Sequence, residues 1–215
     1  MNTLDSRFLK VGDCYAHRFS TQGTFRYQLS PLALPLSTRH ENDDVNLVTV
    51  GVANDKQQQH NVSVTQVGGN LAADPAQLEV GAGDLVVWAA DKSVKLGFRV
   101  QGQLEDEVID SAALTDESIF THAFGLPGTY SWVDANGSGV RGEIEVAMPD
   151  AAGSDPKAWL ATLEQGEMVH VQGEQASPEQ VQIVVGQTVV WAIEKAPGIT
   201  ITDASLLIFQ DAPQH

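Results

Sequence analysis

The chain has 215 residues, which is enough for one large domain or two small ones. Its 28 acidic and 12 basic residues give a formal net charge of −16. Nucleic acids and anionic lipids bind Lys/Arg clusters, so this balance disfavours both as partners. The acidity suits a well-solvated surface or, alternatively, a cation-binding patch. Hydrophobic residues make up 42% of the chain and include 4 Trp, which suffices for folded cores.

Cysteine use and the N-terminal residues bear on the redox state and the location of the protein. The single cysteine, Cys14, excludes an intrachain disulfide and a site with several thiolates. Residues 1–7 show no basic region followed by an apolar run, and no stretch reaches the roughly 18 apolar residues of a membrane span. We therefore expect a cytoplasmic protein without membrane insertion, or export by a route without a cleaved leader.

The first quarter of the chain reads as strands and loops. Alternating apolar and polar residues predict strands at 15–19 and 24–29, and Gly23 in the turn between them is suited to a positive φ. A Pro- and Leu-rich loop follows and ends in an acidic run. His40 with Glu41, Asp43 and Asp44 in this run is either a solvated loop or a divalent-cation site. A strand at 47–52 and a polar linker at 54–59 come next.

Residues 60–148 read as a continuous set of strands. We predict strands at 62–67, 78–80, 85–88 and 98–100, with Gly81, Gly83 and Asp84 marking the turn before a buried strand. Residues 105–107 form a charge cluster that we expect to be solvated, and residues 119–146 close this set.

Residues 149–167 contain the one predicted helix. Ser154 is a candidate N-cap, and Pro156 suits the first turn. Trp159, Leu160 and Leu163 share one helical face, and Gly166 can end the helix. We expect a linker helix whose apolar side covers the edge of a sheet.

Two segments of the chain occur twice. His17-x-Phe19 with Gly23-Thr24-Phe25-x-Tyr27 matches the stretch from His122 to Trp132 without gaps, and residues 75–89 match residues 178–192, including Val-Val-Trp. We interpret the chain as the second half of one repeated unit, then a whole unit, then the first half of the split unit. Residues 1–53 are then completed by residues 168–215, within one chain or between two chains, and residues 60–148 form a complete domain.

The repeated stretch resembles the last two strands of the cupredoxins, the β-sandwiches of the blue-copper proteins. The matching scaffold residues are Phe124, Pro127, Gly128, Thr129, Tyr130, Gly142, Ile144 and Val146. The resemblance implies an all-β protein of two cupredoxin-like Greek-key β-sandwiches with one short linker helix. It also implies that His17 and His122, which are equivalent in the repeat, are structural.

The copper-ligand positions of that family carry other residues in this chain. In the whole unit they fall on Leu96, Asp134, Gly137 and Val140, and in the split unit they fall near Ile199, Leu29, Leu32 and Pro35. Type 1 copper needs two imidazoles and a thiolate, so we expect no metal and no cofactor. Cys14 aligns with Ile119 and is predicted to be a small buried hydrophobic residue.

Catalytic motifs are also missing from the sequence. There is no Gly-x-Ser-x-Gly elbow, no His-Glu-x-x-His and no phosphate-binding loop, so we expect no enzyme activity and no catalytic residue. The expected function is that of a structural protein, a building block of a homo-oligomer or a larger assembly. The alternative is a module that binds a glycan, a peptide or a divalent cation through loops 30–44, 101–115 and 134–139, with Trp132 and Trp159 as available aromatic contacts.

Overall fold

The computed structural model describes residues 3–31, 46–104, 107–149 and 156–207. The chain is nearly all-β, with 59% strand and 4% helix, and its sheets pack in a sandwich-like arrangement. This confirms the predicted all-β class. The predicted helix is present as α1 (Pro156–Leu163). A 3₁₀ turn, η1, spans Ala204–Leu206.

The strands fall into two sets, which we call the N-lobe (β1 to β9) and the C-lobe (β10 to β19). The N-lobe strands are β1 (Asp13–Arg18), β2 (Gly23–Pro31), β3 (Asn46–Gly51), β4 (Gln59–Val67), β5 (Asn70–Asp74), β6 (Gln77–Gly81), β7 (Leu85–Ala90), β8 (Phe98–Leu104) and β9 (Glu107–Asp110). The C-lobe strands are β10 (Leu114–Thr115), β11 (Ser118–Ala123), β12 (Gly128–Val133), β13 (Arg141–Ala147), β14 (Glu167–Gln172), β15 (Gln175–Ser177), β16 (Gln180–Val184), β17 (Thr188–Glu194), β18 (Pro197–Ile199) and β19 (Thr202–Asp203).

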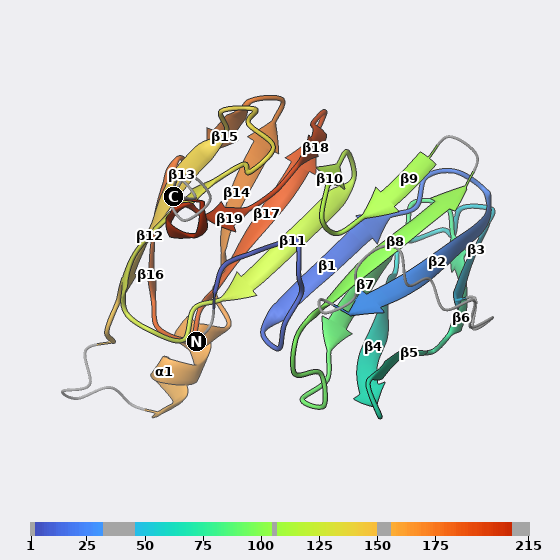
Figure 1. The fold of residues 1–215 in the computed structure, drawn as a ribbon, viewed down its shortest axis with the longest axis horizontal. Helices are drawn as coiled ribbons and strands as arrows, with labels where there is room; N and C mark the ends of the chain where they lie inside the picture. Colours follow the sequence, from blue (N-terminus) through green and yellow to red (C-terminus); the bar gives the residue numbers. More distant parts are fainter. Residues whose placement is uncertain (1–2, 32–45, 105–106, 150–155, 208–215) are drawn as a thin grey trace, which may run out of the picture.

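One sheet runs through both lobes. Its eight strands have the order β15-β14-β17-β11-β1-β7-β4-β5, and the antiparallel pair β1–β11 is the seam between the lobes. The N-lobe adds a five-stranded sheet, β6-β3-β2-β8-β9, and the C-lobe adds a four-stranded sheet, β16-β13-β12-β19. Figure 1 shows the lobes side by side, with blue to green strands on the right and yellow to red strands on the left.

Both smaller sheets cover the same face of the eight-stranded sheet. Tyr15 and Phe120 are direct partners across the seam, so their side chains point to the same face. Tyr15 stacks on Trp88 in the N-lobe, and Phe120 stacks on Trp191 in the C-lobe. The two cores therefore lie next to each other above one continuous sheet.

Aromatic residues of the smaller sheets close the two cores from the other side. Tyr27 of β2 packs on Trp88 with ring centroids 5.4 Å apart, and Trp132 of β12 packs on Trp191 at 6.0 Å. In β2 the alternation predicted from the sequence holds, because Phe25 and Tyr27 are buried whereas Arg26 is exposed. Burying one such large side chain stabilises the fold by about 1.5–3 kcal/mol.

The strand pairing differs from the expected division of the chain. Strands β1 and β3 pair with β7 and β6, so residues 13–51 are completed by residues 59–110. Strands β11 and β13 pair with β17 and β16, so residues 114–147 are completed by residues 167–203. The expected joining of 1–53 to 168–215 around a domain at 60–148 is therefore wrong. The sequence repeat fits either grouping, and the short linker after Gly51 favours pairing with the next segment.

Candidate functional site

Three of the positions that the cupredoxin resemblance assigns to copper ligands lie in one loop of the C-lobe. Asp134 follows β12, is 6% exposed, and begins a loop that contains Gly137 and ends at Val140. The backbone N–H of Asp134 donates to the carbonyl of Val140 at 2.9 Å, and the N–H of Gly137 donates to the carbonyl of Asp134 at 3.2 Å. Gly137 has a φ of 87°, a conformation that suits glycine in a tight turn.

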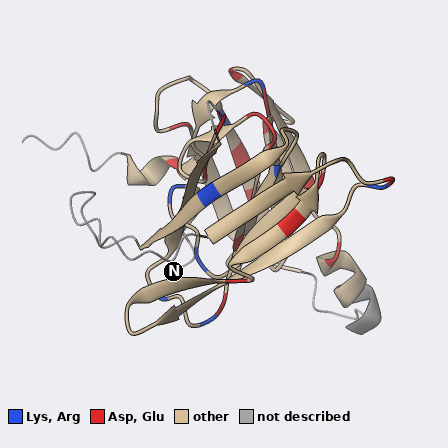
Figure 2. Ribbon diagram, turned by 90° about the vertical axis from the view of Figure 1, so that its right-hand side faces the viewer, with Lys and Arg blue, Asp and Glu red and all other residues tan. Residues whose placement is uncertain are grey.

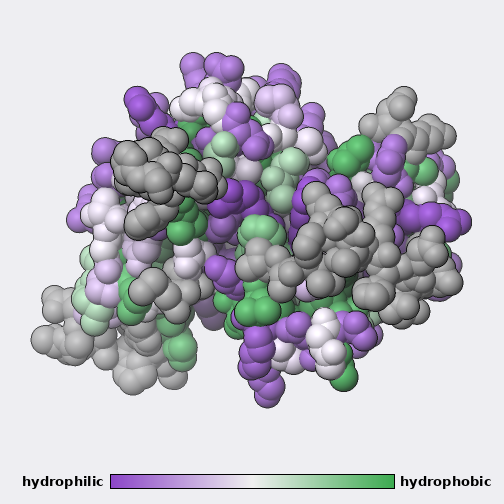
Figure 3. Space-filling model, in the orientation of Figure 1, coloured by the Kyte–Doolittle hydropathy of each residue, from purple (hydrophilic) through white to green (hydrophobic). Residues whose placement is uncertain are grey.

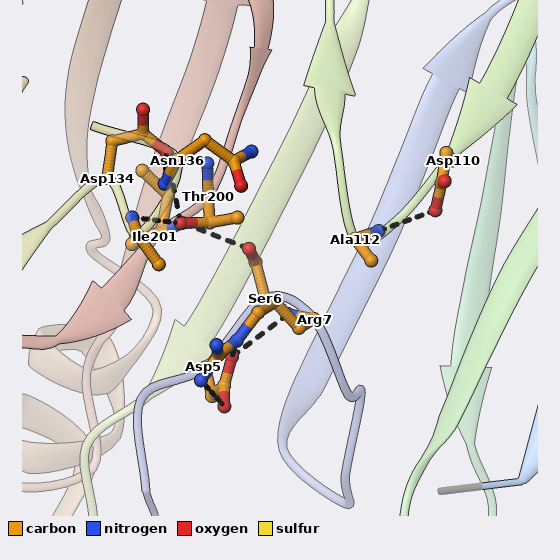
Figure 4. Close-up of polar contacts among 10 residues, drawn as sticks. Asp5, Ser6, Arg7, Asp110, Ala112, Asp134, Asn136, Thr200 and Ile201 are labelled. Carbon is orange, nitrogen blue, oxygen red and sulfur yellow. Dashed lines mark hydrogen bonds and ion pairs between the residues drawn. The ribbon is translucent and has the colours of Figure 1, made fainter. Parts of the chain in front are cut away.

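The carboxylate of Asp134 joins this loop to the segment that leads into β19 (Figure 4). Its Oδ1 accepts from the N–H of Thr200 at 2.8 Å, from the Thr200 hydroxyl at 3.1 Å and from the N–H of Asn136 at 3.0 Å. Its Oδ2 accepts from the N–H of Ser138 at 3.0 Å. Four donors of the chain itself therefore point at the carboxylate of Asp134, three of them at Oδ1 and one at Oδ2.

These hydrogen bonds favour the ionised form of Asp134. Burial by itself would raise the pKa of this carboxyl, but the backbone donors of Ser138, Thr200 and Asn136 lower it below its ordinary value. Asn136 strengthens the same junction, because its Nδ2 donates to the carbonyl of Gly198 at 2.9 Å. The result is an ionised, internally satisfied carboxylate that fastens two loops together.

Leu96 lies apart from this loop, in the N-lobe connection between β7 and β8. Its side chain is 53% exposed. It adjoins Gly97, where an added Cβ would meet the carbonyl of Leu9 at 3.0 Å and the side chain of Lys10 at 3.3 Å. The expected grouping of Leu96 with Asp134, Gly137 and Val140 is therefore wrong. The hydrogen-bond partners of that loop are Gly198 and Thr200, on either side of Ile199, because the C-lobe is completed by its own later strands.

Of the copper-ligand positions expected near Leu29, Leu32 and Pro35, Leu29 lies on β2 of the N-lobe, the lobe that also contains Leu96. Leu29 is partly buried and packs against the core. Leu32 and Pro35 lie outside the described residues, as does the acidic run around His40. In the described parts of the chain, no three His, Cys, Asp or Glu side chains cluster closely enough to hold a metal ion.

Residues 5–9 form a polar segment, which we call the N-terminal strap, that connects the two lobes. The N–H of Ser6 donates to the carbonyl of Ile201 at 2.9 Å, and the hydroxyl of Ser6 accepts from the N–H of Ile201 at 2.9 Å (Figure 4). Three residues later, Leu9 exchanges backbone hydrogen bonds with Phe98 of β8. The segment thus begins against the C-lobe and ends against the N-lobe, and the adjacent Arg7 is held by two contacts to the carboxylate of Asp5.

Residues 110–114 form an equivalent strap, in which the roles of the two lobes are exchanged. Ser111 exchanges the same two hydrogen bonds with Val100 of the N-lobe, at 2.9 and 3.0 Å. Leu114 then pairs with Ile199 of the C-lobe. Asp110 precedes Ser111 as Asp5 precedes Ser6, and it binds Arg99 as Asp5 binds Arg7. Each lobe therefore holds the segment that leads into the first long strand of the other lobe.

The repeated histidines lie at the seam and are paired with acids that sequence reasoning missed. His122 is 1% exposed and its Nδ1 lies 2.6 Å from Oδ1 of Asp13, which is also buried. His17 is 2% exposed and its Nε2 lies 3.3 Å from Oε1 of Glu107. Glu107 had been expected in a solvated cluster, but it is a strand residue of β9. The hydrogen bond with His17 lowers the pKa of Glu107, and partial burial opposes this effect.

Aromatic and apolar residues at the surface also differ in part from the expectations. Trp132 is buried at 1% exposure and is not available for a ligand. The side chain of Trp159 is not among those that the structure describes. Cys14 is only half-buried and lies on the outer side of β1. Leu160 of α1 is 58% exposed, whereas Leu163 of the same helix lies against Gly186 before β17. Figure 3 shows hydrophobic residues scattered among hydrophilic ones on the face drawn there.

The charged residues of the described segments do not gather on one surface in the view of Figure 2. In Figure 2 acidic and basic positions are scattered over turns and strands. No helix in the described parts of the chain is long and apolar enough to cross a membrane. A scan against protein-family models finds no match, and neither a search of curated proteins nor a search of solved structures finds one.

Proposed function

We propose that the chain is a non-catalytic, metal-free structural protein built from two cupredoxin-like Greek-key sandwiches, and that it is a building block of a homo-oligomer. The all-β, sandwich-like architecture and the repeated strand pairing support the first part of this proposal. The non-catalytic, structural role is supported by the way that polar contacts are used. The strongest of them hold loops and lobes of the chain together instead of converging on an open pocket.

One observation carries the metal-free assignment. Asp134 stands at the position that corresponds to the thiolate ligand of the blue-copper family, and its carboxylate accepts four hydrogen bonds from Thr200, Asn136 and Ser138. A metal ion at Oδ1 would have to displace the donors that point at this oxygen. The loop that would hold copper in a cupredoxin is therefore used here as a structural junction.

Copper uptake tests this assignment directly. The protein is incubated with excess Cu²⁺, passed through a desalting column and analysed for bound copper by elemental analysis, with Asp134→Asn as the matched variant. We expect substoichiometric copper in both proteins and no difference between them. Stoichiometric copper in the parent that is lost in Asp134→Asn would contradict the proposal.

The assembly role is tested by size in solution. Sedimentation velocity over a wide range of protein concentrations should show species larger than the 23.0 kDa chain. A protein that remains a strict monomer at the highest concentration would contradict a building-block function.

A further inference from the structure

The seam between the lobes has two equivalent ends, and the buried contact between His122 and Asp13 lies at one of them. The sequence repeat makes His17 equivalent to His122 and Ser118 equivalent to Asp13. In the antiparallel register of β1 and β11, His17 lies directly opposite Ser118, as His122 lies directly opposite Asp13. The second end of the seam therefore has a hydroxyl where the first end has a carboxylate.

His17 directs a different ring nitrogen to its acid. Its Nε2 lies 3.3 Å from Oε1 of Glu107, whereas His122 uses its Nδ1 to contact Asp13. The contact with His17 lowers the pKa of Glu107, so this acid is an ionised acceptor and the proton of the neutral imidazole lies on Nε2. The Nδ1 of His17 then carries a lone pair that can accept a hydrogen bond.

Three polar atoms at this end of the seam differ from most buried polar atoms of the described residues. They are Nδ1 of His17, the hydroxyl of Ser118 and the hydroxyl of Tyr15, and none of them reaches hydrogen-bond geometry with another atom of the described chain. His17 is 2% exposed, and Ser118 and Tyr15 are fully buried. Buried polar groups in folded proteins are nearly always hydrogen-bonded, either to the protein or to ordered water.

The strand geometry brings these three groups together. Tyr15 and His17 are two residues apart on β1 and point to the same face, and Ser118 is the direct partner of His17. The Cβ atoms of such partners are about 4.5–5.5 Å apart, and the Nδ1 and Oγ atoms are each close to their own Cβ. Burial raises the pKa of Tyr15 and the nearby Ser118 opposes this effect, which places Ser118 beside the Tyr15 hydroxyl. One small molecule can therefore reach all three groups.

The other end of the seam shows how the same space is used when a carboxylate is present. There the carboxylate of Asp13 contacts the imidazole directly, and the aromatic neighbour is Phe120, which has no hydroxyl. At the His17 end, the side chain of Ser118 is shorter by a carbon and an oxygen, and the aromatic neighbour is Tyr15. A directly bonded acid is thus replaced by neutral groups that need a bridge between them.

We propose that Nδ1 of His17 and the hydroxyls of Ser118 and Tyr15 bind one internal water molecule, which bridges β1 and β11. Water fits because it can donate to Nδ1 while it donates to one hydroxyl and accepts from the other. Three protein partners are typical of an internal water molecule. The ionised Glu107 nearby disfavours an anion. The seam is then closed by a direct side-chain contact at one end and by a water bridge at the other, whatever the oligomeric state of the chain.

A high-resolution crystal structure of the full chain tests this site directly. We expect electron density for a single water molecule within hydrogen-bond distance of Nδ1 of His17 and of the hydroxyls of Ser118 and Tyr15. Direct hydrogen bonds among these three groups, with no water between them, would overturn the inference. This measurement needs no mutation, so its result does not depend on whether a variant folds.

Oxygen-17 relaxation dispersion counts long-lived internal water molecules in solution and provides the second measurement. Tyr15→Phe combined with Ser118→Ala removes two of the three partners and keeps the ring that Phe120 provides at the equivalent position. We expect the count to fall by one water molecule in this double variant. Tyr27→Phe, which removes a buried hydroxyl beside Trp88, is the control and should keep the parent count. An unchanged count in a folded double variant would overturn the inference.

Discussion

The imidazole of His122 lies 2.6 Å from the carboxylate of Asp13, and this buried contact joins the two lobes across their seam. The second carboxylate oxygen of Asp13 accepts from the backbone N–H of Lys10 at 2.8 Å. Replacing Asp13 by Ala removes the partner of the buried His122 imidazole and of the part-buried Lys10 N–H. We expect a loss of about 3–5 kcal/mol in the free energy of unfolding, measured by urea titration. Glu145→Ala, at an exposed position, is the control and should change stability by less than about 0.5 kcal/mol.

The two straps provide a matched pair of mutations. Ser6→Ala removes the acceptor of the Ile201 N–H, and Ser111→Ala removes the acceptor of the Val100 N–H. Both serines are fully buried, so each variant should lose about 1–3 kcal/mol of stability. Ser63→Ala, on the exposed side of β4, should be close to neutral. If Ser111→Ala is costly and Ser6→Ala is not, the N-terminal strap does not hold the lobes together in solution.

Asp84 should make the stability of the N-lobe depend on pH. Burial would raise its pKa, but the N–H groups of Gly81 and Gln58 and the imidazole of His60 lower it to about 2 from an ordinary value of 3.8. A carboxyl whose pKa is lower in the folded state stabilises the fold above its unfolded pKa, and this contribution is lost as the pH falls. We expect the free energy of unfolding, measured by urea titration at each pH, to decline between about pH 4 and about pH 2. Asp84→Asn should be less stable at neutral pH and should show a weaker decline.

Gly142 is predicted to be intolerant of any side chain. An added Cβ would lie 2.7 Å from the carbonyl oxygen of Glu179 and 2.7 Å from Nε1 of Trp132. Both neighbours are packed parts of the C-lobe, so Gly142→Ala should cost about 1–3 kcal/mol through overpacking. Gly125→Ala is the control, since nothing lies within 4 Å of its added Cβ. Equal thermal stability of the two variants would show that β13 can shift to make room.

Much of the fold could be predicted from the local sequence pattern. The alternation around Phe25 and Tyr27 and the Val-Val-Trp runs ending at Trp88 and Trp191 placed strands correctly, because burial on one face imposes a period of two. The helix was also predicted, although its exposed Leu160 shows that its apolar face is not fully used. These features depend on neighbours in the sequence.

The grouping of the strands and the contacts of the site could not be predicted in the same way. A repeat of equivalent segments does not say which copy pairs with which, so the whole domain expected at 60–148 was wrong. The acids that pair with the histidines also escaped prediction, since Glu107 lies 90 residues from His17 and Asp13 lies 109 residues from His122. The role of Asp134 as a junction became visible only when Thr200 was placed beside it.

The reciprocal straps affect how the protein unfolds and how it responds to proteolysis. Each lobe binds the segment that leads into the first long strand of the other lobe. Unfolding or proteolytic removal of one lobe therefore removes contacts that the other lobe needs. Heating should therefore give a single cooperative transition. A cut in the linker after Gly51 should leave the fragments intertwined and migrating together until a denaturant is added.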